Sequence, residues 1–183
     1  MFSIFEKIIE IMKNKCVFLD RDGVINVDNV NYTYKVEAFE IIDGVIPALK
    51  MLKDAGYLLI IITNQSGIAK GIYKAEDVYK CHDYFDAESG NLIDEYFYSP
   101  YHQSTTESLS RKPDSLMFEK AIAKYDIDIN QSWMVGDRER DILPANKLNI
   151  PTILIEEFPN TETSAKYKVD SLFEAAELIL GRV

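Results

Sequence analysis

The 183-residue sequence has little cysteine and a shortage of basic side chains. Only Cys16 and Cys81 are present, which excludes a disulfide-stapled secreted domain and makes a reducing compartment such as the cytoplasm the expected location. With 20 basic and 30 acidic residues, the formal net charge is −10, so no broad positive field would attract nucleic acid or an anionic membrane. We therefore expect neither partner, and an anionic substrate would have to be held by a few local cations and backbone amides.

The chain also lacks a hydrophobic run long enough to cross a bilayer. Residues 1–14 instead carry apolar side chains at three-to-four spacing with charged ones between them, which is typical of an amphipathic helix. We expect this helix to pack on the domain or against a second copy of the chain, which would allow a homodimer; a membrane-surface helix is the alternative. With 47% hydrophobic and 27% charged residues, the segment 15–183 suits one folded domain.

Short apolar runs alternate with segments of helical periodicity along the chain. Strands are predicted at 16–19, 58–62, 96–98, 133–135 and 152–155, and helices at 45–55, 116–125 and 172–180. This alternation predicts a Rossmann-like α/β fold, a doubly wound parallel sheet with helices on both faces. Ligands of such sheets bind beyond the carboxyl ends of the strands. We therefore expect Asp20, Thr63 and Asp137, which follow three of the strands, to converge on one edge of the sheet.

Two carboxylates follow the first predicted strand. Asp20 and Asp22, within Asp-Arg-Asp-Gly at 20–23, could divide the roles of nucleophile and general acid. An EF-hand calcium loop would need Gly at its sixth position and Glu at its twelfth, where this chain has Ile25 and Asn31, so that reading is excluded. A solvated acidic turn is the alternative interpretation of the segment.

Three further polar segments lie later in the chain. Residues 63–67 place a hydroxyl and a run of backbone N–H groups where a helix could begin, which is an arrangement that holds phosphate, or else a polar turn. Arg111 and Lys112 precede a proline, a pattern that by itself indicates a solvated loop. Asp137 follows a glycine, and together with Asp20 it would form an oxygen-only site suited to Mg²⁺.

Taken in this order, the four segments resemble the four motifs of the haloacid dehalogenase (HAD) superfamily of phosphotransferases. The residues at 20–26, 63–71, 111–113 and 135–137 are similar to those of its D-glycero-D-manno-heptose 1,7-bisphosphate phosphatase group, which also includes histidinol-phosphate phosphatases. The resemblance implies a Mg²⁺-dependent phosphatase that removes the 7-phosphate of this heptose bisphosphate. Another small phosphomonoester, such as histidinol phosphate, is an alternative substrate, and a non-catalytic binding protein on the same fold is an alternative function.

The resemblance also implies a role for each motif residue. Asp20 would attack phosphorus and form an aspartyl-phosphate, while Asp22 would protonate the leaving oxygen and then activate water, so Asp22 should carry a proton when the substrate arrives. Mg²⁺ would be held by Asp20, the backbone carbonyl of Asp22, and Asp137. Thr63 and Lys112 would contact the remaining phosphate oxygens.

Other residues near the motifs are assigned supporting roles. Asp141 would orient Lys112 or a metal-bound water rather than bind the metal. Arg111 is a candidate for substrate recognition, since a guanidinium matches phosphate or sugar hydroxyls. The remaining candidate substrate-binding residues lie in loops at the strand ends: Asp28, Asn31, Asn64, Gln65, Ser66 and Arg138.

Two features of related enzymes are missing from this chain. The intervals between the motifs are too short for a separate lid domain, so loops such as 26–40 and 99–110 are expected to roof the site. The structural zinc loop of the heptose and histidinol phosphatases has Cys-x-His and Cys-x-Cys before Arg-Lys-Pro, but here the segments are 99–101, Ser-Pro-Tyr, and 108–110, Ser-Leu-Ser. We therefore expect no zinc, and a loop that is either ordered by Tyr98, Tyr101 and hydroxyl hydrogen bonds or mobile. Cys81 and His82 adjoin in a segment expected to be helical, where neighbours point to different faces, so they are not expected to form a nucleophilic pair.

Overall fold

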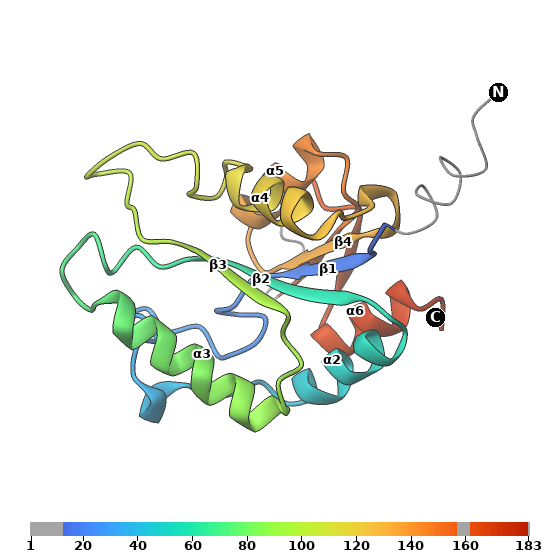
Figure 1. Cartoon of the computed structure of the whole chain (residues 1–183), viewed down its shortest axis with the longest axis horizontal. Coiled ribbons are helices and arrows are strands. Elements are labelled where there is room, and N and C mark those ends of the chain that lie inside the picture. Colours follow the sequence, from blue (N-terminus) through green and yellow to red (C-terminus); the bar gives the residue numbers. More distant parts are fainter. Residues whose placement is uncertain (1–12, 157–161, 183) are drawn as a thin grey trace.

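A six-stranded parallel sheet forms the centre of the computed structural model, which describes residues 13–156 and 162–182 (Figure 1). The strand order is β3-β2-β1-β4-β5-β6. The strands are β1 (Cys16–Leu19), β2 (Leu58–Asn64), β3 (Glu95–Ser99), β4 (Trp133–Gly136), β5 (Thr152–Ile155) and β6 (Tyr167–Val169). Most of the helix predicted for 1–14 lies outside the described residues, so its packing and the homodimer it would allow stay predictions.

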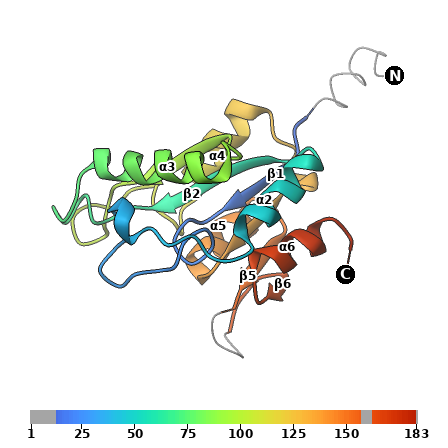
Figure 2. The ribbon, with the colours of Figure 1, turned by 90° about the horizontal axis from the view of Figure 1, so that it is seen from below.

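Helices cover both faces of the sheet, as Figure 1 and Figure 2 show. The helices are α2 (Val45–Asp54), α3 (Ala75–Ser89), α4 (Leu116–Tyr125), α5 (Glu139–Lys147) and α6 (Leu172–Ile179), with short 3-10 turns η1 (Val36–Ala38) and η2 (Ile129–Gln131). Val17 and Leu19 of β1 belong to one core with α2, α3 and α6, whereas Cys16 and Phe18 belong to a second core with α4 and α5. This alternation is that of a strand buried on both faces.

The predicted doubly wound sheet is confirmed, with most element bounds within two residues of the prediction. α3 occupies the segment around Cys81 and His82 that was expected to be helical. α5 and β6 have no counterpart among the predicted elements. Pro144 lies inside α5, where its missing N–H and its ring interrupt the usual helical pattern. β6 has three residues at the edge of the sheet, two of them exposed, and so carries little hydrophobic signal.

The sheet register brings three strand ends to the same level. Leu19 pairs with Ile61 of β2 and with Val135 of β4, and the Asp20 N–H continues the β1–β4 pairing by donating to the Val135 carbonyl at 3.0 Å. The residues that follow these positions therefore meet at one edge, as predicted. The segments 26–40 and 99–110 join elements at this edge and, apart from η1, contain no helix or strand.

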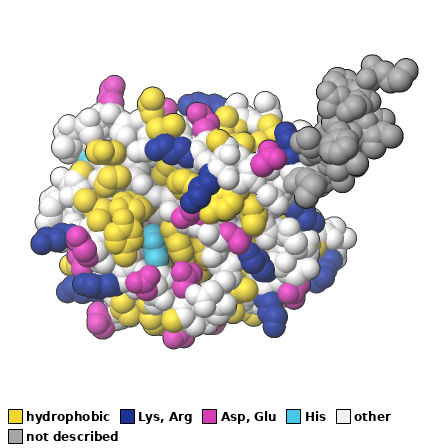
Figure 3. All heavy atoms as spheres, in the orientation of Figure 1, with side chains coloured by type: hydrophobic (Ala, Val, Ile, Leu, Met, Phe, Trp, Pro, Cys, Tyr) yellow, Lys and Arg dark blue, Asp and Glu magenta, His cyan; other side chains and the backbone are white. Residues whose placement is uncertain are grey.

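The outer surface carries charges of both signs. On the face shown in Figure 3, acidic and basic side chains are interspersed rather than gathered by sign. None of the described helices combines the length and the apolar character that a bilayer-spanning helix needs.

Candidate active site

A buried lysine links two carboxylates at the carboxyl end of β1. Lys112 Nζ lies 2.8 Å from Asp20 Oδ1 and 2.6 Å from Asp141 Oδ1, and it donates to the Ile62 carbonyl at 2.6 Å. Asp20 is 2% exposed, Lys112 1% and Asp141 0%. The Lys112 ammonium group is thus in contact with two carboxylate oxygens and one carbonyl oxygen. Lys112 therefore bridges the two aspartates, and the orienting role predicted for Asp141 stays a prediction.

The charged groups of this bridge shift one another's pKa values. Burial and the nearby Asp141 raise the pKa of Asp20 to about 6, against the opposing effects of Lys112 and Arg140. Burial lowers the pKa of Lys112, but Asp141 and Asp20 outweigh it, so the pKa is raised above its ordinary value. Lys112 therefore stays protonated and offsets part of the acidic charge. Arg140 is absent from the predicted site, although its place three residues after Asp137 brings its charge to the same carboxylates.

Asp137 completes a group of three carboxylates. Asp20, Asp137 and Asp141 each offer an oxygen, and these oxygens lie within 4.8 Å of one another. Burial, with Asp20 and Asp141 close by, raises the pKa of Asp137 to about 8, and within the described residues its buried Oδ1 has no hydrogen-bond partner. Oxygen-only donors with an unpartnered buried carboxylate oxygen fit a hard divalent cation such as Mg²⁺. The group includes the two side chains predicted as ligands, Asp20 and Asp137, and adds Asp141.

Position 23 has to be glycine for Asp137 to occupy its place. Gly23 has a φ of +88°, and a Cβ added there would lie 2.4 Å from Asp137 Oδ2. Both the backbone conformation and this contact exclude a side chain. We predict that Gly23→Ala displaces Asp137 and weakens Mg²⁺ binding by about 10- to 100-fold, as measured by titration calorimetry.

Gly90→Ala is the matched control for this prediction. Gly90 also has a positive φ, of +78°, but nothing lies within 4 Å of a Cβ added there. The control variant therefore suffers backbone strain alone and should keep its Mg²⁺ affinity. Equal affinity of the Gly23 variant and the unchanged protein would contradict the assignment of Asp137 to the metal group.

Asp22 is held by donors from three side chains. Arg21 Nη2 donates to both carboxylate oxygens, at 2.9 and 3.0 Å, and Asn26 Nδ2 and Gln65 Nε2 donate at 3.0 and 3.1 Å. Arg21 is only 1% exposed and is itself anchored on the Thr33 carbonyl at 2.7 Å. These contacts suit an ionised carboxylate. The role of Asp22 as acid and base stays a prediction.

The side chains of Thr63 and Asn64, at the end of β2, and of Gln65, just after it, make different contacts. Thr63 Oγ1 accepts a bond from Gln65 Nε2 at 3.0 Å, which leaves the hydroxyl proton for another acceptor. Asn64 Oδ1 accepts from the Lys112 N–H and Asn64 Nδ2 donates to the Lys112 carbonyl, both at 3.0 Å. Gln65 is 1% exposed, and its amide oxygen accepts from Tyr73. The amides of Asn64 and Gln65, predicted to bind substrate, are thus engaged within the protein.

Of the other predicted substrate-binding residues, Arg138 and Asp28 are connected to the metal group by ion pairs. Arg138 Nε is 2.9 Å from Asp137 Oδ2 and its Nη2 is 3.3 Å from Asp28 Oδ2, so Arg138 connects the metal group to the loop 26–40. Asn31 is exposed on that loop, and Ser66 is 8% exposed. Substrate contacts by these residues stay predictions.

Serine hydroxyls form hydrogen bonds across the loop 99–110, which is the ordered alternative of the two that were expected. Ser110 Oγ lies 3.2 Å from Ser99 Oγ and 2.9 Å from Ser108 Oγ. Arg111 Nη1 donates to the Tyr101 carbonyl at 3.0 Å, across the same loop. Hydrogen bonds thus connect the segments 99–101 and 108–110, which contain neither cysteine nor histidine. That the protein holds no zinc stays a prediction, which metal analysis tests.

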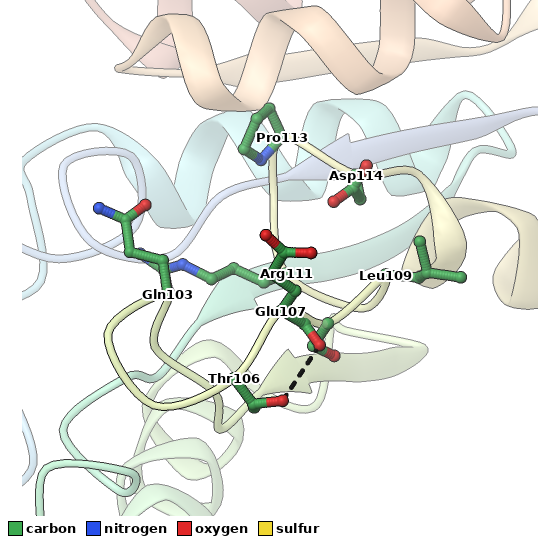
Figure 4. Close-up of a pocket in the computed structure, with 8 residues that line it drawn as sticks. Gln103, Thr106, Glu107, Leu109, Arg111, Pro113 and Asp114 are labelled. Atoms are coloured by element: carbon green, nitrogen blue, oxygen red, sulfur yellow. Dashed lines mark hydrogen bonds between the residues drawn. The ribbon is translucent and has the colours of Figure 1, made fainter.

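A pocket of 520 Å³ adjoins this loop. Arg111 and Pro113, the two neighbours of Lys112, line it together with Gln103, Glu107 and Asp114 (Figure 4). The Arg111 side chain runs toward Gln103 in this view. The pocket therefore offers space and a guanidinium beside the loop 99–110.

Comparisons with known proteins agree with this architecture. A family described as "HAD-hyrolase-like" matches residues 109–172. The D-glycero-beta-D-manno-heptose-1,7-bisphosphate 7-phosphatase of Pasteurella multocida is 37% identical over 180 residues, which cover 91% of this chain and 97% of that protein. The corresponding alpha-heptose enzyme of Campylobacter jejuni is 39% identical over 147 residues, which cover 79% and 83%. A crystal structure of D,D-heptose 1.7-bisphosphate phosphatase from B. bronchiseptica, complexed with magnesium and phosphate, has a TM-score of 0.81 and 24% identity and covers 92% of this chain and 99% of that one.

The parallel sheet, the match to the HAD-like family model and the curated relatives together define a HAD-like hydrolase. On the identity with its relatives, the chain belongs to the D-glycero-D-manno-heptose-1,7-bisphosphate 7-phosphatase family of these hydrolases, whose members are phosphoric monoester hydrolases. The resemblance drawn from the four motifs is thereby confirmed.

Proposed function

We propose that this chain removes the 7-phosphate from D-glycero-D-manno-heptose 1,7-bisphosphate, through transient phosphorylation of Asp20 and with Mg²⁺ as its cofactor. The observation that carries the proposal is the buried Asp20–Lys112–Asp141 bridge, whose carboxylates form one group with Asp137. The relatives named for this activity include enzymes for both anomers at similar identity, so the anomer is decided by assay.

Asp20 is arranged to act as the nucleophile. Its Oδ1 accepts from the Arg21 N–H at 2.8 Å and lies 2.8 Å from Lys112 Nζ, so Oδ2 is the oxygen left to attack. Attack forms the bond from Asp20 to phosphorus and breaks the bond from phosphorus to the sugar oxygen. Water then attacks phosphorus, which releases inorganic phosphate and restores Asp20.

The phosphoryl group needs its negative charge neutralised during both steps. When bound by Asp20 and Asp137, Mg²⁺ supplies positive charge next to the phosphate. Lys112 keeps its own charge beside Asp20, and Thr63 has a hydroxyl proton to donate to a phosphate oxygen. Asp141 holds Lys112 in place through the 2.6 Å contact.

Asp22 is the candidate acid and base. After taking up a proton, it would give that proton to the departing sugar oxygen and then accept one from the attacking water. Arg21, Asn26 and Gln65 hold its carboxylate by hydrogen bonds. Arg111, beside the pocket, is the candidate for binding the second phosphate or the sugar hydroxyls.

Metal dependence and a substrate panel test this proposal. The protein should release phosphate from heptose 1,7-bisphosphates with Mg²⁺, lose that activity in EDTA, and regain it when Mg²⁺ is restored. We expect kcat/KM to be higher for a heptose bisphosphate than for histidinol phosphate or nucleotide phosphates. A higher value for histidinol phosphate would replace the proposed substrate, and binding without hydrolysis of any compound would favour a non-catalytic protein.

A further inference from the structure

We propose that Tyr73 and Gln65 are positioning residues for the phosphatase reaction. In this inference the Tyr73 hydroxyl sets the orientation of the Gln65 amide, and the amide holds both Asp22 and Thr63. It rests on the proposed function, because Asp22 and Thr63 matter here only as the acid–base group and the phosphate contact.

The hydrogen bonds run from Tyr73 to the two functional side chains without a gap. The Tyr73 hydroxyl donates to Gln65 Oε1 at 2.8 Å. Gln65 Nε2 donates to Asp22 Oδ2 at 3.1 Å and to Thr63 Oγ1 at 3.0 Å. Tyr73 is 5% exposed and Gln65 1%, so water does not substitute easily for either group. Both amide protons of Gln65 and one lone pair of its amide oxygen therefore take part in hydrogen bonds.

The orientation of the amide decides what Asp22 and Thr63 face. In the observed orientation they receive two N–H donors. If the amide were reversed, its carbonyl oxygen would face the oxygens of both residues, and neither would receive a bond. The Tyr73 hydroxyl gives its proton to the amide oxygen, and the Asp22 carboxylate accepts from the amide nitrogen, so the two contacts together favour the observed orientation. Burial raises the pKa of Tyr73 to about 12, which keeps the hydroxyl protonated as this donor.

The Tyr73 ring is held in place by close packing. A Cβ at Gly67 would lie 2.0 Å from a Tyr73 ring carbon, so only glycine leaves room for the ring there. The ring also stacks on the Tyr34 ring, with centroids 5.0 Å apart. It packs edge-to-face with the Tyr32 ring, with centroids 5.8 Å apart. Tyr32 and Tyr34 belong to the loop 26–40. The loop expected to roof the site therefore packs on the residue that orients Gln65.

Tyr73→Phe removes the hydroxyl and keeps the ring that packs on Gly67 and Tyr34. Loss of one buried hydrogen bond that acts through Asp22 and Thr63 should lower kcat about 3- to 30-fold, with KM changed less than about twofold. Tyr34→Phe is the matched control, because the Tyr34 hydroxyl makes no hydrogen bond with any other described residue. This control should keep the unchanged kcat and KM.

A double-mutant cycle separates positioning from general damage to the fold. Gln65→Met keeps the length of the side chain but removes its hydrogen bonds, and it should lower kcat at least as far as Tyr73→Phe. Adding Tyr73→Phe to Gln65→Met should lower kcat no further, because the hydroxyl acts only through the amide. Circular dichroism and Mg²⁺ titration of each variant should match the unchanged protein.

The outcomes distinguish this inference from the function on which it rests. If the unchanged protein hydrolyses no phosphate ester, the proposed function fails and this inference fails with it. If the unchanged protein is active and Tyr73→Phe or Gln65→Met has the same kcat, the inference alone is overturned. Independent, multiplying losses in the double variant would also overturn it. Should Tyr73→Phe fail to fold, the kcat and KM of Gln65→Met decide the matter by themselves.

Discussion

Asp20→Asn is expected to lower phosphate release by about 10³-fold or more, because an amide oxygen cannot form the covalent intermediate. The fold should survive the change. Burial and Asp141 raise the pKa of Asp20 to about 6, so the ionised form is disfavoured in the folded protein. The resulting penalty is present above that pKa and disappears as the pH falls below it. A neutral amide should therefore leave stability at neutral pH unchanged or higher.

Steady-state assays and thermal unfolding test both parts of this expectation. Asp83→Asn makes the same chemical change at an exposed aspartate of α3 and should keep full activity. An Asp20 variant with more than a tenth of the original kcat would remove Asp20 from the role of nucleophile. If the variant loses activity only because it unfolds, the expectation that the neutral amide leaves stability unchanged or higher is wrong.

Lys112→Met is expected to cost about 3–5 kcal/mol in the free energy of unfolding, because it leaves buried carboxylates without their cation. Asp20 and Asp141 would then face each other, and the Ile62 carbonyl would lose its donor. Activity should fall with stability, since the nucleophile loses one of its two contacts on Oδ1. Lys112 lowers the pKa of Asp20, so its removal raises that pKa further. The stability deficit should therefore shrink as the pH falls and Asp20 takes up a proton.

Lys53→Met is the control for the loss of a lysine ion pair. Lys53 Nζ pairs with Asp94, but the two side chains are 30% and 24% exposed. Solvent screens such a pair, so its loss should cost no more than about 1 kcal/mol. Urea unfolding of both variants at several pH values measures the difference. Equal costs for the two substitutions would contradict the view that Lys112 is the structural centre of the site.

Much of the fold could be predicted because the sheet is buried on both faces. Its strands are short, continuous apolar runs, and a polar residue follows each run that ends at the site. The carboxyl ends of parallel strands lie at one edge, so Asp20, Thr63 and Asp137 could be placed together without any knowledge of their side-chain contacts. α5 could not be predicted in the same way, because Pro144 and a charged first turn hide its helical pattern.

The partners of the site residues were less predictable. Asn64 lies in a motif that predicts phosphate contact, yet its amide clamps the backbone of Lys112, which is 48 residues away in the chain. Gln65 reaches Asp22 across 43 residues. Such pairings depend on the register of neighbouring strands and the rotamer of each side chain, which no local pattern encodes. Gly67, which makes room for the Tyr73 ring, is a sequence feature that relates to this contact. It indicates the contact only once the fold is known.

Direct detection of a phosphorylated Asp20 tests the central claim. The protein would be mixed with Mg²⁺ and a heptose 1,7-bisphosphate, quenched in acid during turnover, digested, and examined by mass spectrometry. We predict phosphate on the Asp20 side chain in the quenched sample and none in a sample quenched after the substrate is exhausted. Phosphate on another residue, or steady release of inorganic phosphate from an enzyme that never carries phosphate on Asp20, would contradict the account.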